Sequence, residues 1–288
     1  MSGPPAAGAA ALPTLAAARR AGVPIVMLTA YDHPSARAAQ AAGVDVVLVG
    51  DSAAMTVLGY ETTRAISTDE LLMLTRAVRR AITAGIPVVG DLPYGSYEAS
   101  DAVAVATARR FVSEAGCDAV KLEGGGAMLS RVRAIVAAGI PVIGHVGLLP
   151  QSVTSADGYR AQGRGVADAL AIVADADALQ DAGCAALVIE AVPAAVGAAI
   201  CGRLAIPVIG IGAGGETHGQ VLVYHDLLGL GEGRVARFVR RYLDGRGDQM
   251  DAIRRWAADV RAGRFPDETE SYSAPDDTRD AIARLPAR

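Results

Sequence analysis

The chain has 288 residues, of which 51% are hydrophobic and 20% charged, and its formal net charge is −4. So large an apolar fraction excludes general disorder and suffices for the core of a large α/β domain. Acidic and basic residues are interspersed, which excludes the clustered basic face of a nucleic-acid-binding protein.

The amino-terminal segment is rich in Ala, Gly and Pro and lacks the charged start and compact apolar block of a signal peptide. We expect residues 1–14 to form a flexible lead, followed by a short helix from Leu15 to Ala21. No apolar run approaches the ~20 residues that a membrane-spanning helix needs. The sequence therefore predicts a cytoplasmic protein that does not enter a membrane.

A recurring phrase predicts the strands. Segments such as AGIPVVGD and AGIPVIGH place an apolar-Pro step before a short Val/Ile run, and AGVDVVLVGD varies the theme. Short β-branched runs bounded by Gly and Pro are typical of buried parallel strands. The eight predicted strands begin near Ile25, Val46, Pro87, Ala119, Pro141, Ala186, Pro207 and Val221.

Segments with helical spacing lie between most of these strands, for example DELLMLTRAVRRAITAG. Eight strand–helix units predict a single (β/α)8 barrel of the TIM type. The rival is an open, doubly wound sheet. The link between the last two strands is too short for a helix, so we expect the repeat to break there.

Two further helices are predicted in the carboxyl-terminal part, over RVARFVRRYLDG and then MDAIRRWAADVRAG. After Phe265 the sequence turns polar and predicts a loosely attached tail. We therefore expect one domain over residues 15–265 and a tail over residues 266–288. The three cysteines lie in or beside apolar stretches without metal-binding spacing, and we expect buried thiols at Cys117, Cys184 and Cys201.

Polar residues end nearly every predicted strand. In an α/β barrel the chemistry lies at the carboxyl ends of the strands, where the loops form the open face. A single acid there can simply cap the next helix, and this remains an alternative for Asp51. Several acids on different strands indicate a functional site. The residues concerned are Asp51, Ser52, Asp91, Lys121, Glu123, His145 and Glu190.

Converging carboxylates repel one another unless a cation or proton intervenes. Oxygen ligands of this kind favour Mg²⁺, and neither a His pair nor a thiolate cluster supports zinc.

Lys121 is the only Lys among 27 basic residues. Its compact ammonium can reach a substrate carboxylate where a planar guanidinium would not fit. An ion pair with Glu123 that has only a structural role is the alternative.

The segment GIGAGG, residues 210–215, could cradle a phosphate, but a tight turn at the barrel rim explains it equally well. For His33, His218 and His225 we expect ordinary hydrogen-bonded side chains.

A family resemblance rests on motifs that follow one another between Ile25 and Gly231. They are TAYD, VGDS, GDLP, VKLEGG, GHVGLLPQS, GYRAQGR, IEAVP, IPVIGIGAG and VYHDLLG. In this order they resemble ketopantoate hydroxymethyltransferases. The resemblance implies a Mg²⁺-dependent barrel that moves a one-carbon unit from 5,10-methylenetetrahydrofolate to the 2-oxo acid 3-methyl-2-oxobutanoate. It also implies a homo-oligomer, expected to be a decamer.

The resemblance implies roles for the site residues. Asp51, Asp91 and Glu123 correspond to metal-site carboxylates, and Asp51 and Asp91 also border the substrate. Ser52 and Lys121 correspond to contacts with the substrate carboxylate. The base corresponds to Glu190, and His145 lines the same pocket.

Three departures concern folate and subunit contacts: Ala53-Ala54, Leu149 and the segment GRVARFVRRYL. One rival is a Mg²⁺-dependent lyase of the isocitrate lyase/phosphoenolpyruvate mutase type, whose Lys-Lys-Cys-Gly loop is missing from the sequence. Another is a non-catalytic barrel subunit, against which the complete set of polar residues argues.

Overall fold

The computed structural model describes residues 12–83, 85–153, 159–232 and 235–286. Eight parallel strands close into one barrel in the order in which they occur along the chain. This confirms the predicted (β/α)8 barrel and excludes the open sheet. The strands are β1 Ile25–Thr29, β2 Val46–Val49, β3 Val88–Asp91, β4 Ala119–Lys121, β5 Val142–Gly147, β6 Ala186–Glu190, β7 Val208–Ile211 and β8 Gly219–Leu222.

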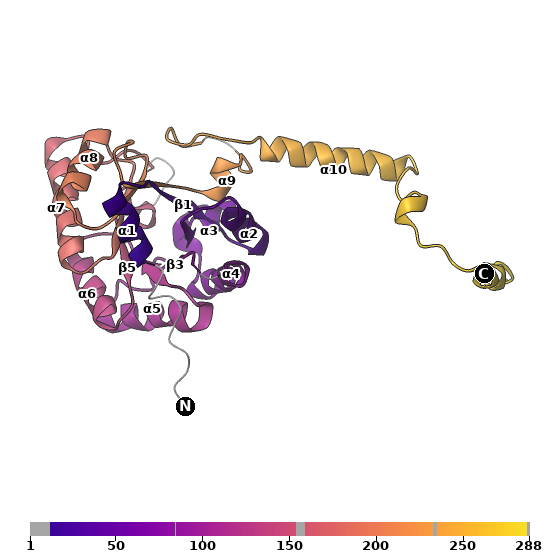
Figure 1. The fold of residues 1–288 in the computed structure, drawn as a ribbon, viewed down its shortest axis with the longest axis horizontal. Helices are drawn as coiled ribbons and strands as arrows, with labels where there is room; N and C mark the ends of the chain where they lie inside the picture. The colour runs from indigo at the N-terminus through magenta and orange to yellow at the C-terminus, as the bar shows by residue number, and fades with distance from the viewer. Residues whose placement is uncertain (1–11, 84, 154–158, 233–234, 287–288) are drawn as a thin grey trace, which may run out of the picture.

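Helices follow the first six strands and surround the barrel (Figure 1). The α-helices are α1 Pro13–Ala21, α2 His33–Ala41, α3 Ala53–Thr56, α4 Thr68–Ala81, α5 Asp101–Ala115, α6 Leu129–Ala137, α7 Val166–Asp181, α8 Ala194–Arg203, α9 Tyr224–Leu227, α10 Gly245–Arg261 and α11 Asp276–Ala283. Short 3₁₀ helices are η2 Thr63–Ala65, η3 Gly126–Met128, η4 Pro150–Ser152 and η6 Glu268–Glu270.

The strand alternation builds two apolar layers. In β2, Val46 and Leu48 belong to the cluster that fills the barrel. Val47 and Val49 belong to the cluster between the strands and the surrounding helices. Side chains of a strand point alternately to its two faces, so a continuous Val/Leu run serves both layers. The three cysteines are buried free thiols, as predicted.

Local signals set the ends of several elements. Ser67 and Glu70 form a reciprocal capping box at the start of α4, which begins one residue before the predicted helical segment. The predicted amino-terminal helix is confirmed as α1, which begins at Pro13. Leu12 and Leu15 join the inner apolar cluster, so α1 closes one end of the barrel. Residues 1–11 of the expected lead lie outside the described residues.

The repeat breaks where the sequence predicted it. No helix lies in residues 212–218 between β7 and β8, all of which the structure describes. The eighth strand begins at Gly219, two residues before the predicted start. It ends before the Tyr-His-Asp sequence, which forms the short helix α9.

The predicted helix over residues 234–245 is wrong. Residues 235–244 are irregular, and the N–H groups of Tyr242 and Gly245 donate to carbonyls of Leu227 and Leu228 at 2.9 Å. Phe238 packs against the apolar cluster inside the barrel. These tertiary contacts outweigh the helical propensity of the segment.

The second predicted carboxyl-terminal helix is confirmed as α10. It projects away from the barrel, and α11 lies farther out (Figure 1). Its side chains are largely exposed, including Ile253 and Trp256. In the described part of the chain, no helix has both the length and the apolar character needed to cross a membrane.

Candidate active site

The predicted polar residues meet in one pocket at the carboxyl ends of the strands, with a volume of about 250 Å³. The barrel topology brings together side chains from β2 to β6 that are far apart in sequence. All seven residues predicted from the sequence line this pocket: Asp51, Ser52, Asp91, Lys121, Glu123, His145 and Glu190.

Lys121 pairs most closely with Asp91. The register of β3 and β4 sets these two residues side by side. Nζ of Lys121 lies 2.7 Å from both carboxylate oxygens of Asp91, and both residues are buried. Oε1 of Glu123 is 4.0 Å from the same Nζ. The closest ion pair therefore joins two strands and does not involve Glu123, the partner considered from the sequence.

The positive charge near the pocket acids does not keep the pKa values of Asp51 and Asp91 at their ordinary level. Burial and repulsion from Asp91 raise the pKa of Asp51, while Lys121 opposes the rise. Burial also raises the pKa of Asp91, again opposed by Lys121. Burial alone would raise the pKa of Glu123, but His145 and Lys121 hold it below its usual value. A further cation would favour the ionised form of this group of acids.

His145 lies between two carboxylates. Its Nδ1 is 3.4 Å from Oε1 of Glu123, and its Nε2 is 3.4 Å from Oε2 of Glu190. Neither contact has hydrogen-bond geometry, so the attraction is ionic. Burial alone would lower the pKa of His145, but the two carboxylates outweigh burial and raise it to about 9. The imidazole is therefore protonated near neutral pH.

The backbone around Glu190 is tightly constrained. Ala191 has a φ of 47°, which non-glycine residues rarely adopt. Gly147 has a φ of 94°, and a Cβ there would lie 2.2 Å from the carbonyl oxygen of Glu190. Leu148 donates its N–H to that same oxygen at 2.8 Å. These contacts fix the position from which the Glu190 side chain enters the pocket.

Asp51 does not cap the helix that follows it. Ser52 is the N-cap of α3, and no side chain caps this helix. Oδ2 of Asp51 instead accepts a hydrogen bond from Nε2 of Gln151 at 2.9 Å. Oγ of Ser52 shares a hydrogen bond of 2.7 Å with the hydroxyl of Tyr31.

Sequence reasoning missed the polar residues that surround the acids. Gln151, Tyr97 and Arg64 form a connected network beside Asp51 and Glu123. Gln151 falls within a motif that carried the family resemblance, but neither its charge nor its spacing indicated a role. Its burial in the structure identifies it, because Gln151 is only 3% exposed and a buried polar side chain needs hydrogen-bond partners.

The Gly-rich segment after β7 supports the tight-turn alternative. Gly212 has a φ of 66°, and a Cβ there would lie 2.5 Å from the Phe238 ring. Its role is therefore close packing under the pocket wall. His218 is hydrogen-bonded as predicted, since Nδ1 accepts from the N–H of Val208. His225 departs from the prediction because its buried Nδ1 has no hydrogen-bond partner.

The donor set suits a hard divalent cation. No three His, Cys, Asp or Glu side chains in the described ranges form a ready-made metal cluster. The ammonium of Lys121 instead holds both oxygens of Asp91. Oε1 of Glu123 is buried without a hydrogen-bond partner and makes only ionic contacts, with His145 and Lys121. Carboxylate oxygens from Asp51, Asp91 and Glu123 are of the kind that Mg²⁺ prefers.

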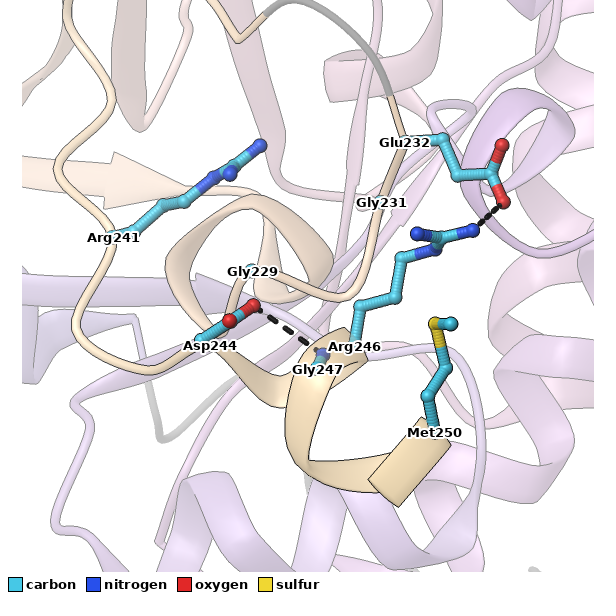
Figure 2. Close-up of a pocket in the computed structure, with 8 residues that line it drawn as sticks. All are labelled: Gly229, Gly231, Glu232, Arg241, Asp244, Arg246, Gly247 and Met250. Atoms are coloured by element: carbon cyan, nitrogen blue, oxygen red, sulfur yellow. Dashed lines mark hydrogen bonds and ion pairs between the residues drawn. The ribbon is translucent and has the colours of Figure 1, made fainter. Parts of the chain in front are cut away.

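A larger cavity, of about 380 Å³, lies at the start of α10, away from this chemistry (Figure 2). Arg246 forms an ion pair with Glu232, and Asp244 accepts from the N–H of Gly247. The polar groups there largely satisfy one another. We therefore assign the chemistry to the smaller pocket, where buried acids converge.

Comparison with known proteins decides the family. Residues 9–268 match the sequence family described as ketopantoate hydroxymethyltransferase. The chain belongs to this family. A 3-methyl-2-oxobutanoate hydroxymethyltransferase of Acidothermus cellulolyticus is 53% identical over 246 residues, covering 85% of this chain and 90% of the relative. One of Moorella thermoacetica is 49% identical over 261 residues, covering 91% and 97%.

Solved structures support the fold of this ketopantoate hydroxymethyltransferase family member. A phosphonopyruvate hydrolase bound to oxalate and Mg²⁺ has a TM-score of 0.61 at 14% identity, with 95% of this chain and 98% of that chain covered. A phosphoenolpyruvate phosphomutase from Streptomyces platensis has a TM-score of 0.58 at 18% identity, with 93% and 94% covered. At such low identity these structures share only the barrel, so the family match outweighs the lyase/mutase alternative.

Proposed function

We propose that this chain transfers a hydroxymethyl group from 5,10-methylenetetrahydrofolate to 3-methyl-2-oxobutanoate, forming ketopantoate in the biosynthesis of pantothenate and coenzyme A. The observation that carries the proposal is the convergence of Asp51, Asp91, Lys121, Glu123 and Glu190 in one pocket. Relatives named for this reaction cover nearly the whole chain. A non-catalytic subunit would not need this set of buried charges.

Mg²⁺ is part of the proposal. Asp51, Asp91 and Glu123 would hold the ion, and its role would be Lewis-acid stabilisation of negative charge on the keto oxygen of the substrate. The unpartnered Oε1 of Glu123 and the excess negative charge of the pocket support this assignment. A barrel of the same fold, phosphonopyruvate hydrolase, forms a complex with oxalate and Mg²⁺, which is compatible with this assignment at the level of the fold alone.

The protein side chains divide the remaining work. Lys121 and Ser52 would bind the substrate carboxylate. Glu190 would accept the proton from C3 of the substrate. C3 would then form a carbon–carbon bond to the one-carbon unit. Water supplies the hydroxyl group, and tetrahydrofolate leaves. The positive charge of His145, 3.4 Å from Glu190, would hold that carboxylate in position.

Self-association also belongs to the proposal, with the decamer of the family resemblance as the expected state. The support is α10, which projects from the barrel with Ile253, Trp256 and Val260 exposed. Exposed apolar side chains of this kind mark interaction surfaces. A cytoplasmic location, one domain over residues 15–265 from which α10 projects, and a tail over residues 266–288 complete the proposal; residues 1–11 of the expected lead lie outside the described residues.

Product formation tests the proposed function. The enzyme would be incubated with 3-methyl-2-oxobutanoate and 5,10-methylenetetrahydrofolate, and ketopantoate would be measured by mass spectrometry. We expect ketopantoate with Mg²⁺, none with excess chelator, and recovery when Mg²⁺ is returned. Metal-replete enzyme that forms no ketopantoate would contradict the proposed reaction, and full activity in metal-free enzyme would contradict the role of Mg²⁺.

A further inference from the structure

We infer that Gln151 is a positioning residue that orients the metal-site carboxylates Asp51 and Glu123, with Tyr97 holding its amide in place. The inference rests on the proposed function, because it assigns these acids to a divalent cation. Gln151 lies in η4, on the loop after β5, whereas Asp51 follows β2 and Glu123 follows β4. One neutral residue thus connects acids contributed by two other strands.

Gln151 donates to both acids. Its side-chain Nε2 donates to Oδ2 of Asp51 at 2.9 Å. Its backbone N–H donates to Oε2 of Glu123 at 3.0 Å. Each carboxylate therefore has one oxygen fixed by Gln151. The other oxygen of Glu123, Oε1, is buried without a hydrogen-bond partner. Only ionic contacts reach this oxygen, from Nδ1 of His145 at 3.4 Å and Nζ of Lys121 at 4.0 Å, so no hydrogen bond opposes its contact with a further cation.

The orientation of the Gln151 amide is itself determined. Nε2 also donates to the carbonyl oxygen of Leu92 at 2.9 Å, so it serves two acceptors. Oε1 accepts from the Tyr97 hydroxyl at 2.7 Å. That hydroxyl also accepts from the N–H of Glu123 at 3.3 Å. The other acceptor near this hydroxyl, the carbonyl oxygen of Glu123, lies farther away at 3.5 Å, so the proton goes to Gln151. A flipped amide would place its oxygen against two acceptors, so only one orientation satisfies the network.

The backbone of Gln151 is held from the outside of the rim. Nη1 of Arg64 donates to its carbonyl oxygen at 3.1 Å. The Arg64 guanidinium lies 3.7 Å from the centroid of the Tyr94 ring, which holds it in place. Gln151 is thus fixed at its side chain, its N–H and its carbonyl. The rigidity of the acids follows from this anchoring.

A neutral donor suits this position physically. A second Lys or Arg here would neutralise the acids and compete with a bound cation. An amide orients the carboxylates and leaves their charge available. Residues that hydrogen-bond to metal ligands typically contribute ~10- to 100-fold in metal affinity. We therefore expect Gln151 to act on metal binding before it acts on chemistry.

The test is metal binding by the full-length apo protein without substrates. Gln151→Met keeps the side-chain length and removes the side-chain hydrogen bonds to Asp51, Leu92 and Tyr97, whereas the backbone N–H still donates to Glu123. Isothermal titration with Mg²⁺, and electron paramagnetic resonance with Mn²⁺, would measure affinity. We expect binding ~10- to 100-fold weaker than wild type. Saturating Mg²⁺ should restore most of kcat, which a disrupted fold would not allow. Gln180→Met is the matched control, because Gln180 accepts from the N–H of Ala205 outside the pocket.

The outcomes separate this inference from the proposed function. Wild-type protein that binds neither metal would overturn the metal site itself. Wild-type affinity in Gln151→Met would overturn only the positioning role. Tyr97→Phe removes the hydroxyl that orients the amide, and it should weaken metal binding to a smaller extent. If Gln151→Met does not fold, unchanged metal affinity in folded Tyr97→Phe would overturn the inference in its place.

Discussion

Nζ of Lys121 lies 2.7 Å from both carboxylate oxygens of Asp91, on the adjacent strand and at the same register. Both residues of this buried ion pair line the pocket, and the ammonium balances the charge of Asp91. A cation that binds Asp91 must therefore share it with Lys121 or release the ammonium. Release would free the ammonium for the substrate carboxylate, which links the proposed roles of these two residues.

Lys121→Arg tests that link. The planar guanidinium is longer than an ammonium and cannot contract to one donor point within the buried strand. We expect the KM for 3-methyl-2-oxobutanoate to rise roughly tenfold or more, with a smaller change in Mg²⁺ affinity. Steady-state kinetics and Mg²⁺ titration would measure the two effects. Wild-type kinetics would reduce Lys121 to a structural partner of Asp91.

Asp91→Asn should weaken Mg²⁺ binding at least ~10-fold, because a charged ligand is lost. It should also destabilise the apo protein by about 3 kcal/mol, since the Lys121 ammonium loses its closest buried partner. Calorimetry would measure both effects. The double variant Asp91→Asn/Lys121→Gln should regain stability without regaining metal affinity. If both properties returned together, Asp91 would not be a ligand.

Gly147→Ala tests the backbone support of Glu190. An L-residue at this positive φ costs about 1–2 kcal/mol, and its Cβ would push against the Glu190 carbonyl. We expect a lower melting temperature and a kcat reduced at least ~10-fold by displacement of the base. Gly202→Ala is the matched control, because nothing lies within 4 Å of its added Cβ. Equal kcat in the two variants would show that the backbone at Gly147 does not affect catalysis.

The charge of His145 predicts a pH dependence of stability in the apo enzyme. Its pKa is about 9 in the folded chain, against an ordinary value of 6.5. The imidazolium therefore stabilises the fold fully below pH 6.5, and this contribution is lost as pH rises through 9. The difference in melting temperature between wild type and His145→Gln should shrink between pH 6.5 and pH 10. A constant difference would show that His145 is neutral.

The sequence predicted the strands because a local pattern determines them. Short β-branched runs bounded by Gly and Pro form strands that are buried in the barrel. It predicted the site because the strands carry their polar residues at the same end. The pairing of Lys121 with Asp91 depends on the register between strands, which no local pattern encodes. Gln151 carries no charge and gave no signal. The segment around Phe238 looked helical, but contacts with the barrel and with α9 determine its structure.

Exchange of the C3 hydrogen of 3-methyl-2-oxobutanoate in deuterated water tests the central claim most directly. This step needs no folate, so it isolates the proposed proton removal by Glu190 from the later steps. Proton nuclear magnetic resonance would follow the exchange in the presence of Mg²⁺. We predict rapid exchange with wild-type enzyme, exchange slowed at least ~10²-fold with Glu190→Gln, and none above background with excess chelator. Exchange at the wild-type rate in Glu190→Gln would contradict the account and require a base other than Glu190.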